Sequence, residues 1–472
     1  MRVLLVGMPD TVSALDAILK VPNLGLCSIA GNLTNCEVRI IDLAFFGRGL
    51  TRVLQKVVAD FEPDLVGLSA MSYQYASARR AAQVCRSARS EMKIALGGYH
   101  ASLMHREIGN ADADYFDFVV RGEGETTFSH LAESIRANDP DYAAIPGLSY
   151  RVNGEFRHNP PARPIDLASL KLPNRSARVA DRAHFLGQPF DCVETSRGCS
   201  QRCRFCSIRE MYGSQVRSFS LDRVVEDLKR LKEAGKRGVF FVDDNITLDV
   251  ARLKSLCQSI IDEKLDDRSY TVQASVVGIA SDPELPALMK RSGFKWVFLG
   301  IESGIRRNLE SMGKKGVLPN VGKAVSGLRA HGIGVFGGFI VGHPDDSLGD
   351  ISTTFKYALE SGVDHPIIQC LTPYPRTQTR QELADSHLIT NADDFSLYNG
   401  FTCNIRTRKL PRRQLNRAIF WNGLRLYFHP RYLSRSRFWR FRATVIPALL
   451  ANNLSYLAGS LTGKVFISRH KW

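Results

Sequence analysis

The sequence predicts an α/β protein in which two parallel sheets, each covered by helices, follow one another and a basic helical region closes the chain. Short apolar runs alternate with amphipathic helical patterns over residues 1–140, and the same alternation resumes over residues 190–394. Such alternation is typical of buried parallel strands joined by helices. The length of 472 residues also exceeds what one core normally holds, which favours several domains.

The first domain, residues 1–140, is expected to be a doubly wound, Rossmann-like sheet. Amphipathic helices such as Ala76–Arg89 separate its strands. Ligands of such sheets lie at the carboxyl ends of the strands. The five predicted strands are Arg2–Gly7, Glu37–Asp42, Asp64–Ser69, Lys93–Gly97 and Phe116–Val120.

Residues 141–189 are predicted to form a linker. They contain many prolines, including Pro160, Pro161, Pro164 and Pro173, and few periodic segments. Asn153 and Gly154 form a dipeptide that is typical of a tight turn, so a small hairpin is expected there.

Residues 190–394 are expected to fold as a partial (β/α)6 barrel. Each predicted strand is followed by a helical pattern, and catalytic groups of such barrels lie at the carboxyl ends of the strands. The six predicted strands are Asp191–Ser196, Gly238–Asp243, Tyr270–Ser275, Trp296–Ile301, Val335–Val341 and Pro366–Leu371.

Three cysteines cluster in the segment Cys199-Ser-Gln-Arg-Cys203-Arg-Phe-Cys206, directly after the first barrel strand. Three thiolates can bind three irons of a four-iron four-sulfur cluster and leave the fourth iron open, whereas a structural zinc site needs a fourth nearby ligand. The next cysteine downstream is Cys257, which is too distant in sequence to complete such a zinc site. The spacing therefore favours an iron–sulfur cluster.

This C-x3-C-x2-C motif, with Phe205 before its last cysteine, resembles the radical S-adenosylmethionine (SAM) superfamily. The resemblance implies that the open iron binds SAM, which one-electron reduction cleaves to a 5′-deoxyadenosyl radical. It also implies SAM contacts at Glu302, which ends the fourth strand in Gly300-Ile-Glu-Ser-Gly304, and at Asp244. Alternatively, Asp243, Asp244 and Asn245 only cap the next helix. The glycines Gly338 and Gly342 could instead simply form a turn. The SAM contacts that the resemblance implies are Phe205, Asp244, Glu302, Gly338 and Gly342.

A second set of small and polar residues ends strands three to five of the first domain, and these residues are Ser69, Gly97, Gly98, Gly122 and Glu123. Together with the cysteine motif, residues 1–394 resemble the cobalamin-dependent radical SAM enzymes. The resemblance implies that these five residues contact cobalamin. No D-x-H-x-x-G motif occurs, because Val12 stands where its histidine would follow Asp10. We therefore expect cobalamin without a histidine on cobalt, with His100 and His105 as alternative ligands.

The related methylthiotransferases carry three further cluster cysteines in their N-terminal domain. Cys27, Cys36 and Cys85 do not stand at the matching strand ends, which disfavours that group. Outside the motif, the cysteines are interpreted as buried free thiols of a reducing, cytoplasmic compartment.

The net charge of +16 is concentrated in the C-terminal region, residues 395–472. This region holds 15 Lys and Arg and no Asp or Glu, which leaves 48 basic and 47 acidic residues in the rest of the chain. Aromatic residues lie among the basic ones from Arg406 to Arg442, and the apolar run Ala443–Ile467 follows. This pattern favours peripheral contact with the inner membrane surface over capping of the barrel, and nucleic acid is the least favoured partner. No run reaches the length of a transmembrane helix.

The resemblance implies methyl transfer through methylcobalamin to an unactivated carbon of a small-molecule, lipid or tetrapyrrole substrate, with a flavodoxin- or ferredoxin-type electron donor. One alternative is a cyclase, ring-contracting or oxidative enzyme that uses the same cofactors without methyl transfer. Another is a cobalamin-binding sensor, which the intact cysteine motif and Glu302 disfavour.

Overall fold

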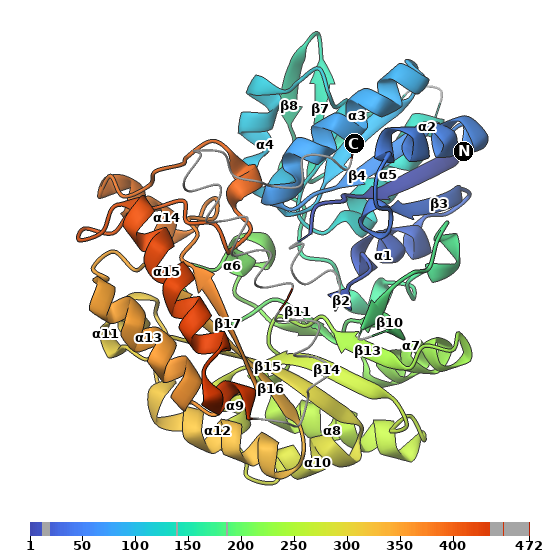
Figure 1. Cartoon of the computed structure of the whole chain (residues 1–472). Helices are drawn as coiled ribbons and strands as arrows, with labels where there is room; N and C mark the ends of the chain where they lie inside the picture. Colours follow the sequence, from blue (N-terminus) through green and yellow to red (C-terminus); the bar gives the residue numbers. More distant parts are fainter. Residues whose placement is uncertain (12–18, 138–139, 186, 435–446, 448–471) are drawn as a thin grey trace.

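The computed structural model describes residues 1–11, 19–137, 140–185, 187–434, 447 and 472. Figure 1 shows two α/β units side by side, with the N-terminal unit in blue to teal and the second unit in green to orange. Both predicted sheets are present, so the predicted fold class is confirmed.

The N-terminal sheet has seven strands in the order β3-β1-β4-β5-β6-β7-β8. The first five are parallel, and the last two run antiparallel as a hairpin. Asn153 and Gly154 have φ values of 51° and 87°, as the turn of such a hairpin requires. This hairpin was expected inside the linker, but it extends the N-terminal sheet. The strands are β1 (Arg2–Gly7), β3 (Glu37–Asp42), β4 (Leu65–Ser69), β5 (Lys93–Gly97), β6 (Phe118–Val120), β7 (Leu148–Val152) and β8 (Glu155–His158).

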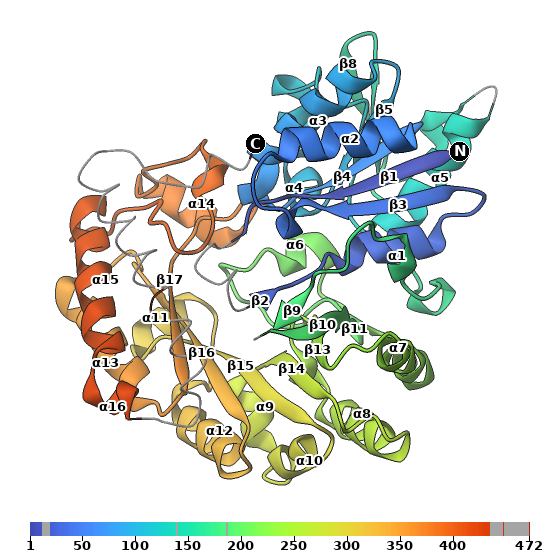
Figure 2. The same ribbon diagram turned by 45° about the vertical axis from the view of Figure 1, so that its right-hand side comes forward.

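Helices cover both faces of this sheet (Figure 2). Helices α1 (Leu24–Asn32) and α5 (Gly124–Arg136) pack together over one core, while α2 (Leu50–Phe61) and α3 (Tyr75–Ala88) pack over the other. Helix α4 (Tyr99–Ala111) follows β5. The strand order reverses between β1 and β4, which places a ligand crevice at the carboxyl ends of these two strands.

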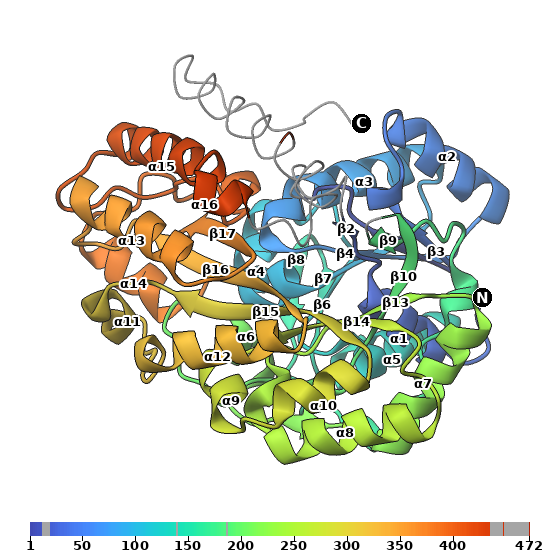
Figure 3. The same cartoon turned by 60° about the horizontal axis from the view of Figure 1, so that its bottom comes forward.

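The second sheet curls into a partial barrel, with helices on its outer side (Figure 3). Its six parallel strands are neighbours in sequence order, and β9 and β2 add an antiparallel edge. Since β2 belongs to the N-terminal segment, this pairing ties the two units together. The strands are β2 (Leu19–Lys20), β9 (His184–Phe185), β10 (Gln188–Val193), β13 (Gly238–Phe241), β14 (Ser269–Ala274), β15 (Phe294–Glu302), β16 (Gly334–Val341) and β17 (His365–Cys370).

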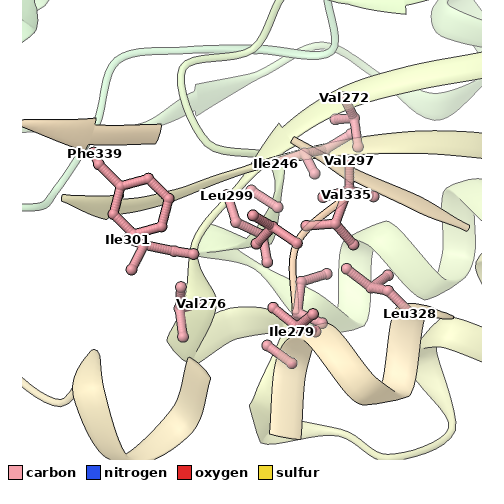
Figure 4. Packing of buried hydrophobic residues seen from close by; sticks show 14 of the residues in the cluster. Ile246, Val272, Val276, Ile279, Val297, Leu299, Ile301, Leu328, Val335 and Phe339 are labelled. Atoms are coloured by element: carbon pink, nitrogen blue, oxygen red, sulfur yellow. The ribbon is translucent and has the colours of Figure 1, made fainter. Parts of the chain in front are cut away.

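A continuous apolar core fills the space between the barrel strands and their helices. Figure 4 shows Val297, Leu299 and Val335 from the strands near Ile279 of α9 (Val276–Ser281) and Leu328 of α12 (Leu318–Ala330). Burial of this core leaves the strand ends as the places for polar site residues. The outer helices are α7 (Leu221–Glu233), α8 (Val250–Asp262), α9 (Val276–Ser281), α10 (Leu285–Arg291), α11 (Arg306–Ser311), α12 (Leu318–Ala330) and α13 (Leu348–Glu360).

The described helices of the C-terminal region pack on the barrel. This region follows α14 (Gln378–Asp385) and contains α15 (Arg412–Tyr427) and α16 (Pro430–Leu433), and α15 lies against α13. The Tyr427 hydroxyl donates to Pro366 O at 3.2 Å. These contacts agree with the capping alternative. The apolar run 443–467 lies outside the described residues except for Pro447. Over the described residues, no helix is long and apolar enough to cross a membrane.

Candidate functional site

The cysteine loop is closed at its base by a short antiparallel ribbon. Strand β10 ends at Val193, three residues before the expected end, and β11 (Ser196–Arg197) then pairs with β12 (Arg217–Ser218). Gly198, which precedes the first cysteine, has φ +90°, and a Cβ there would lie 2.5 Å from Gln215 O. The turn into the loop therefore requires glycine.

Cys199, Cys203 and Cys206 lie on this loop, which leads into α6 (Ile208–Tyr212). All three thiols are half-buried. The Cys206 N–H donates to Cys203 O at 3.2 Å, which folds the loop back on itself. Burial raises the pKa of each thiol, that of Cys206 to about 12, so binding to iron would have to displace the protons.

Within the part of the chain that the structure describes, no three His, Cys, Asp or Glu side chains are grouped as ligands of a single metal ion. A four-iron cluster makes a different demand, because each cysteine binds a separate iron and the sulfurs need not converge on one point. The cysteine loop fits such a cluster.

Glu302 lies beside this loop in a strained conformation. It ends β15 at a register shift and has φ +67°, which is rare for a residue with a side chain. Its Oε1 pairs with Lys314 Nζ at 2.9 Å, and both side chains are largely buried. Lys314 stands two residues after Met312, whose carbonyl accepts the N–H of Arg204 at 3.1 Å, and Arg204 lies between two of the cysteines.

Lys314 was not among the predicted site residues. No local pattern marks it, because it stands outside the strand ends and next to another lysine. Its charge acts on Cys203 and Cys206, and the pKa of Lys314 is raised although burial lowers it, because Glu302 and these thiols favour the charged form.

The three polar residues after β13 have different surroundings. Asp243 accepts hydrogen bonds from Thr195 N, Thr195 Oγ1 and Ser196 Oγ, at 3.0, 2.7 and 2.5 Å, and so holds the base of the cysteine loop. Asn245 accepts from Thr247 N, as a cap would. Asp244 instead lines a cavity, and burial with the neighbouring Asp243 charge raises its pKa to about 6. Of the three, Asp244 is the one that lines this cavity, and its contact with SAM stays a prediction.

The remaining predicted SAM contacts have packing roles in the structure. Phe205 packs against the barrel core. A Cβ at Gly338 would lie 2.5 Å from the Phe298 ring, and one at Gly342 would lie 3.2 Å from Leu415 of α15. Their role in SAM binding stays a prediction.

A cavity of about 380 Å³ lies between the two units. One wall is the carboxyl edge of the N-terminal sheet, and it includes all five predicted cobalamin contacts, Ser69, Gly97, Gly98, Gly122 and Glu123. The other wall comes from the barrel side and consists of Glu194, Arg197, Met211, Tyr212, Val242 and Asp244. Met211 and Tyr212 belong to α6, so the helix that follows the cysteine loop borders the same cavity.

The N-terminal wall fits a large flat ligand. Gly97 has ordinary φ, and the nearest atoms to a Cβ there would be 3.9 Å away, so packing does not explain this glycine. An approaching ligand would explain it. Gly98 differs, because a Cβ there would lie 2.7 Å from Ala70 O. Neither His100 nor His105 lines the cavity, and the described lining residues include no histidine. Cobalamin without a histidine on cobalt stays a prediction.

Two family models match the chain. Residues 13–132 match the B12 binding domain, and residues 193–358 match the radical SAM superfamily. The matches fall on the two units that border the cavity.

Full-length relatives agree with these matches. An uncharacterized methyltransferase of Pyrococcus horikoshii is 30% identical over 93% of this chain and 95% of its own length. An anaerobic magnesium-protoporphyrin IX monomethyl ester cyclase of Rubrivivax gelatinosus is 23% identical over 80% of this chain and 68% of its own.

A solved structure shares the fold. The radical SAM methyltransferase TsrM from Kitasatospora setae, with cobalamin and a [4Fe-4S] cluster bound, superposes with a TM-score of 0.68 at 19% identity. The match covers 82% of this chain and 75% of that one. Together with both family matches and the relative from Pyrococcus, this structure confirms the predicted cofactors. The enzyme uses a [4Fe-4S] cluster, SAM and cobalamin. The chain belongs to the B12-binding radical SAM enzymes.

Proposed function

We propose that the enzyme is a methyltransferase that moves a methyl group to an unactivated carbon of a small-molecule, lipid or tetrapyrrole substrate. The observation that carries this proposal is a cavity lined by both cofactor units, because radical chemistry and a methyl donor must meet at one substrate carbon. The names of the relative from Pyrococcus and of TsrM, both methyltransferases, support it.

When bound, the cluster, SAM and cobalamin would supply a radical initiator and a transferable methyl group. In this proposal Cys199, Cys203 and Cys206 hold the cluster, and the wall with Ser69 and Gly97 holds cobalamin. The protein positions the reacting groups and excludes water. Asp244 is one of the titratable groups that the barrel side presents to the cavity, together with Glu194 and Tyr212, and burial raises the pKa of Asp244 to about 6.

The test is anaerobic reconstitution with iron, sulfide and cobalamin, followed by reductant, SAM and candidate substrates. We expect both 5′-deoxyadenosine and S-adenosylhomocysteine, together with a product heavier by one methyl group. A Cys203→Ala variant is the matched control and should form no 5′-deoxyadenosine. If the wild-type protein bound neither the cluster nor cobalamin, the assignment of the site would be refuted.

A second candidate is a cyclase or other radical enzyme without methyl transfer, which the relative from Rubrivivax favours. It predicts 5′-deoxyadenosine and a changed substrate without S-adenosylhomocysteine. The same assay separates the two candidates. Each also needs a one-electron donor, for which we propose a flavodoxin or ferredoxin.

We further propose peripheral contact with an anionic membrane. On α15 the exposed positions Arg413, Arg417, Trp421 and Arg425 follow each other at helical spacing, and Trp421 is 56% exposed. Phe428 beside them is 52% exposed. Co-sedimentation with anionic vesicles should fall in a Trp421→Ala, Phe428→Ala variant, and equal binding by this variant would contradict the proposal.

A further inference from the structure

Arg197 is the centre of a buried ion network between the two units. Its Nη1 donates to Glu123 Oε1 at 2.9 Å and its Nη2 to Glu125 Oε1 at 2.6 Å, both on the N-terminal unit. Its Nε donates to both oxygens of Glu194, at 3.0 Å each, at the end of the first barrel strand. Arg197 is 5% exposed, so one guanidinium is surrounded by three carboxylates away from water.

Arg217 extends the network from the other side of the cysteine loop. Its Nη1 and Nη2 donate to the two oxygens of Glu123, at 2.9 Å each, and its Nη1 also donates to Ile165 O. Glu123 Oε2 also accepts the N–H of Ile165 at 2.8 Å, so both oxygens of this predicted cobalamin contact are engaged. On the opposite side, Ser28 Oγ donates to Glu125 at 2.7 Å.

The network touches both cofactor sites. Glu123, Glu125, Glu194 and Arg197 all line the cavity. Arg197 and Arg217 stand in β11 and β12, the two strands that close the base of the cysteine loop, and Gly198 alone separates Arg197 from Cys199. Both ends of the cysteine loop are thus bound to the glutamates of the predicted cobalamin wall.

We propose that Arg197 is a positioning residue that locks the cysteine loop to the cobalamin wall and thereby sets the spacing between the cluster and the cobalt. A guanidinium suits this role because its five donors have a fixed planar geometry, which an ammonium lacks. Arg197 uses that geometry to hold three carboxylates from two domains in one arrangement. A network that only held the domains together would not need to border the cavity or adjoin the loop.

A buried arginine elsewhere gives a matched control. Arg175 donates to both oxygens of Asp227, at 2.6 and 2.9 Å, and to Cys192 O, and its side chain is 15% exposed. It lies outside the cavity lining. Arg197→Gln and Arg175→Gln both leave buried carboxylates without their arginine, so both should lower the thermal midpoint. Their effects on cofactor spacing should differ.

The experiment measures the magnetic interaction between cob(II)alamin and the reduced cluster by EPR, in the full chain loaded with both cofactors. This interaction depends steeply on distance. We expect a narrow distribution of interaction strengths in the wild type and in Arg175→Gln. The distribution should be broadened, or the interaction lost, in Arg197→Gln, and Arg197→Lys should give an intermediate width. Glu125→Gln, which keeps the side-chain volume, should broaden the interaction as Arg197→Gln does, and it decides the matter if Arg197→Gln does not fold.

An unchanged interaction in Arg197→Gln, or in Glu125→Gln where that variant decides, would overturn the proposal. Equal broadening in Arg175→Gln would also overturn it, because general destabilisation would then explain the effect. The measurement requires the two cofactors but no methyl transfer. Failure of the proposed methyltransferase activity would therefore leave this result unaffected, and the two failures can be told apart.

Discussion

Replacement of Gly97 by leucine tests the predicted cobalamin wall directly. Gly97 ends β5 at the cavity, and a Cβ there would have no neighbour closer than 3.9 Å, so the unliganded protein has room for a side chain. A leucine side chain would occupy the space that a ligand packed against that backbone needs. Forced overpacking of this kind costs about 1–3 kcal/mol. Since 1.4 kcal/mol corresponds to a tenfold change, the Kd for cobalamin should rise about 5- to 150-fold.

The assay is an anaerobic titration of hydroxocobalamin into the cluster-loaded protein, followed by absorbance and equilibrium dialysis. Gly47→Leu is the control, because a Cβ at Gly47 would meet nothing within 4 Å and Gly47 lies outside the cavity lining. Both variants should keep the wild-type thermal midpoint. A wild-type Kd in Gly97→Leu would refute the placement of cobalamin against this edge.

Three further predictions concern the surroundings of the site. Lys314→Met removes a cation whose field reaches Cys203 and Cys206, so the reduction potential of the anionic cluster should fall in an EPR-monitored titration, whereas Lys314→Arg should keep it. Burial lowers the pKa of His100 to about 4. As the pH falls from about 6.5 to 4, the unfolded chain takes up the proton first, so up to about 3 kcal/mol of the free energy of unfolding should be lost. Urea unfolding at pH 4.5 and 7.5 should show a smaller loss in His100→Phe. Asp243→Ala leaves the buried donors of Thr195 unpaired and should lower the free energy of unfolding by about 1–3 kcal/mol, and an unchanged value would show that water replaces the carboxylate.

Local patterns were enough to predict most of the fold. The strands β1, β3 and β5 have the predicted bounds, because each is a short apolar run that ends in glycine or a polar residue. The cysteine motif could also be recognised in the sequence, since one loop holds all three thiols at a short, fixed spacing. The five cobalamin contacts could be grouped because carboxyl ends of parallel strands share one edge, and the structure brings them to one cavity.

Contacts between distant segments could not be predicted in this way. Glu123 was expected at the cavity, but its two arginine partners stand 74 and 94 residues away, and nothing local to Glu123 marks them. The pairing of β2 with β9, the approach of Leu415 to Gly342 and the place of Lys314 beside Glu302 have the same origin. The sequence by itself determined the two sheets, the cluster motif and the carboxyl edges where ligands bind, because hydrophobic period and residue spacing are local properties. Only the tertiary structure decided which charged side chains join the two cofactor units, because such ion pairs depend on how the chain brings distant residues together.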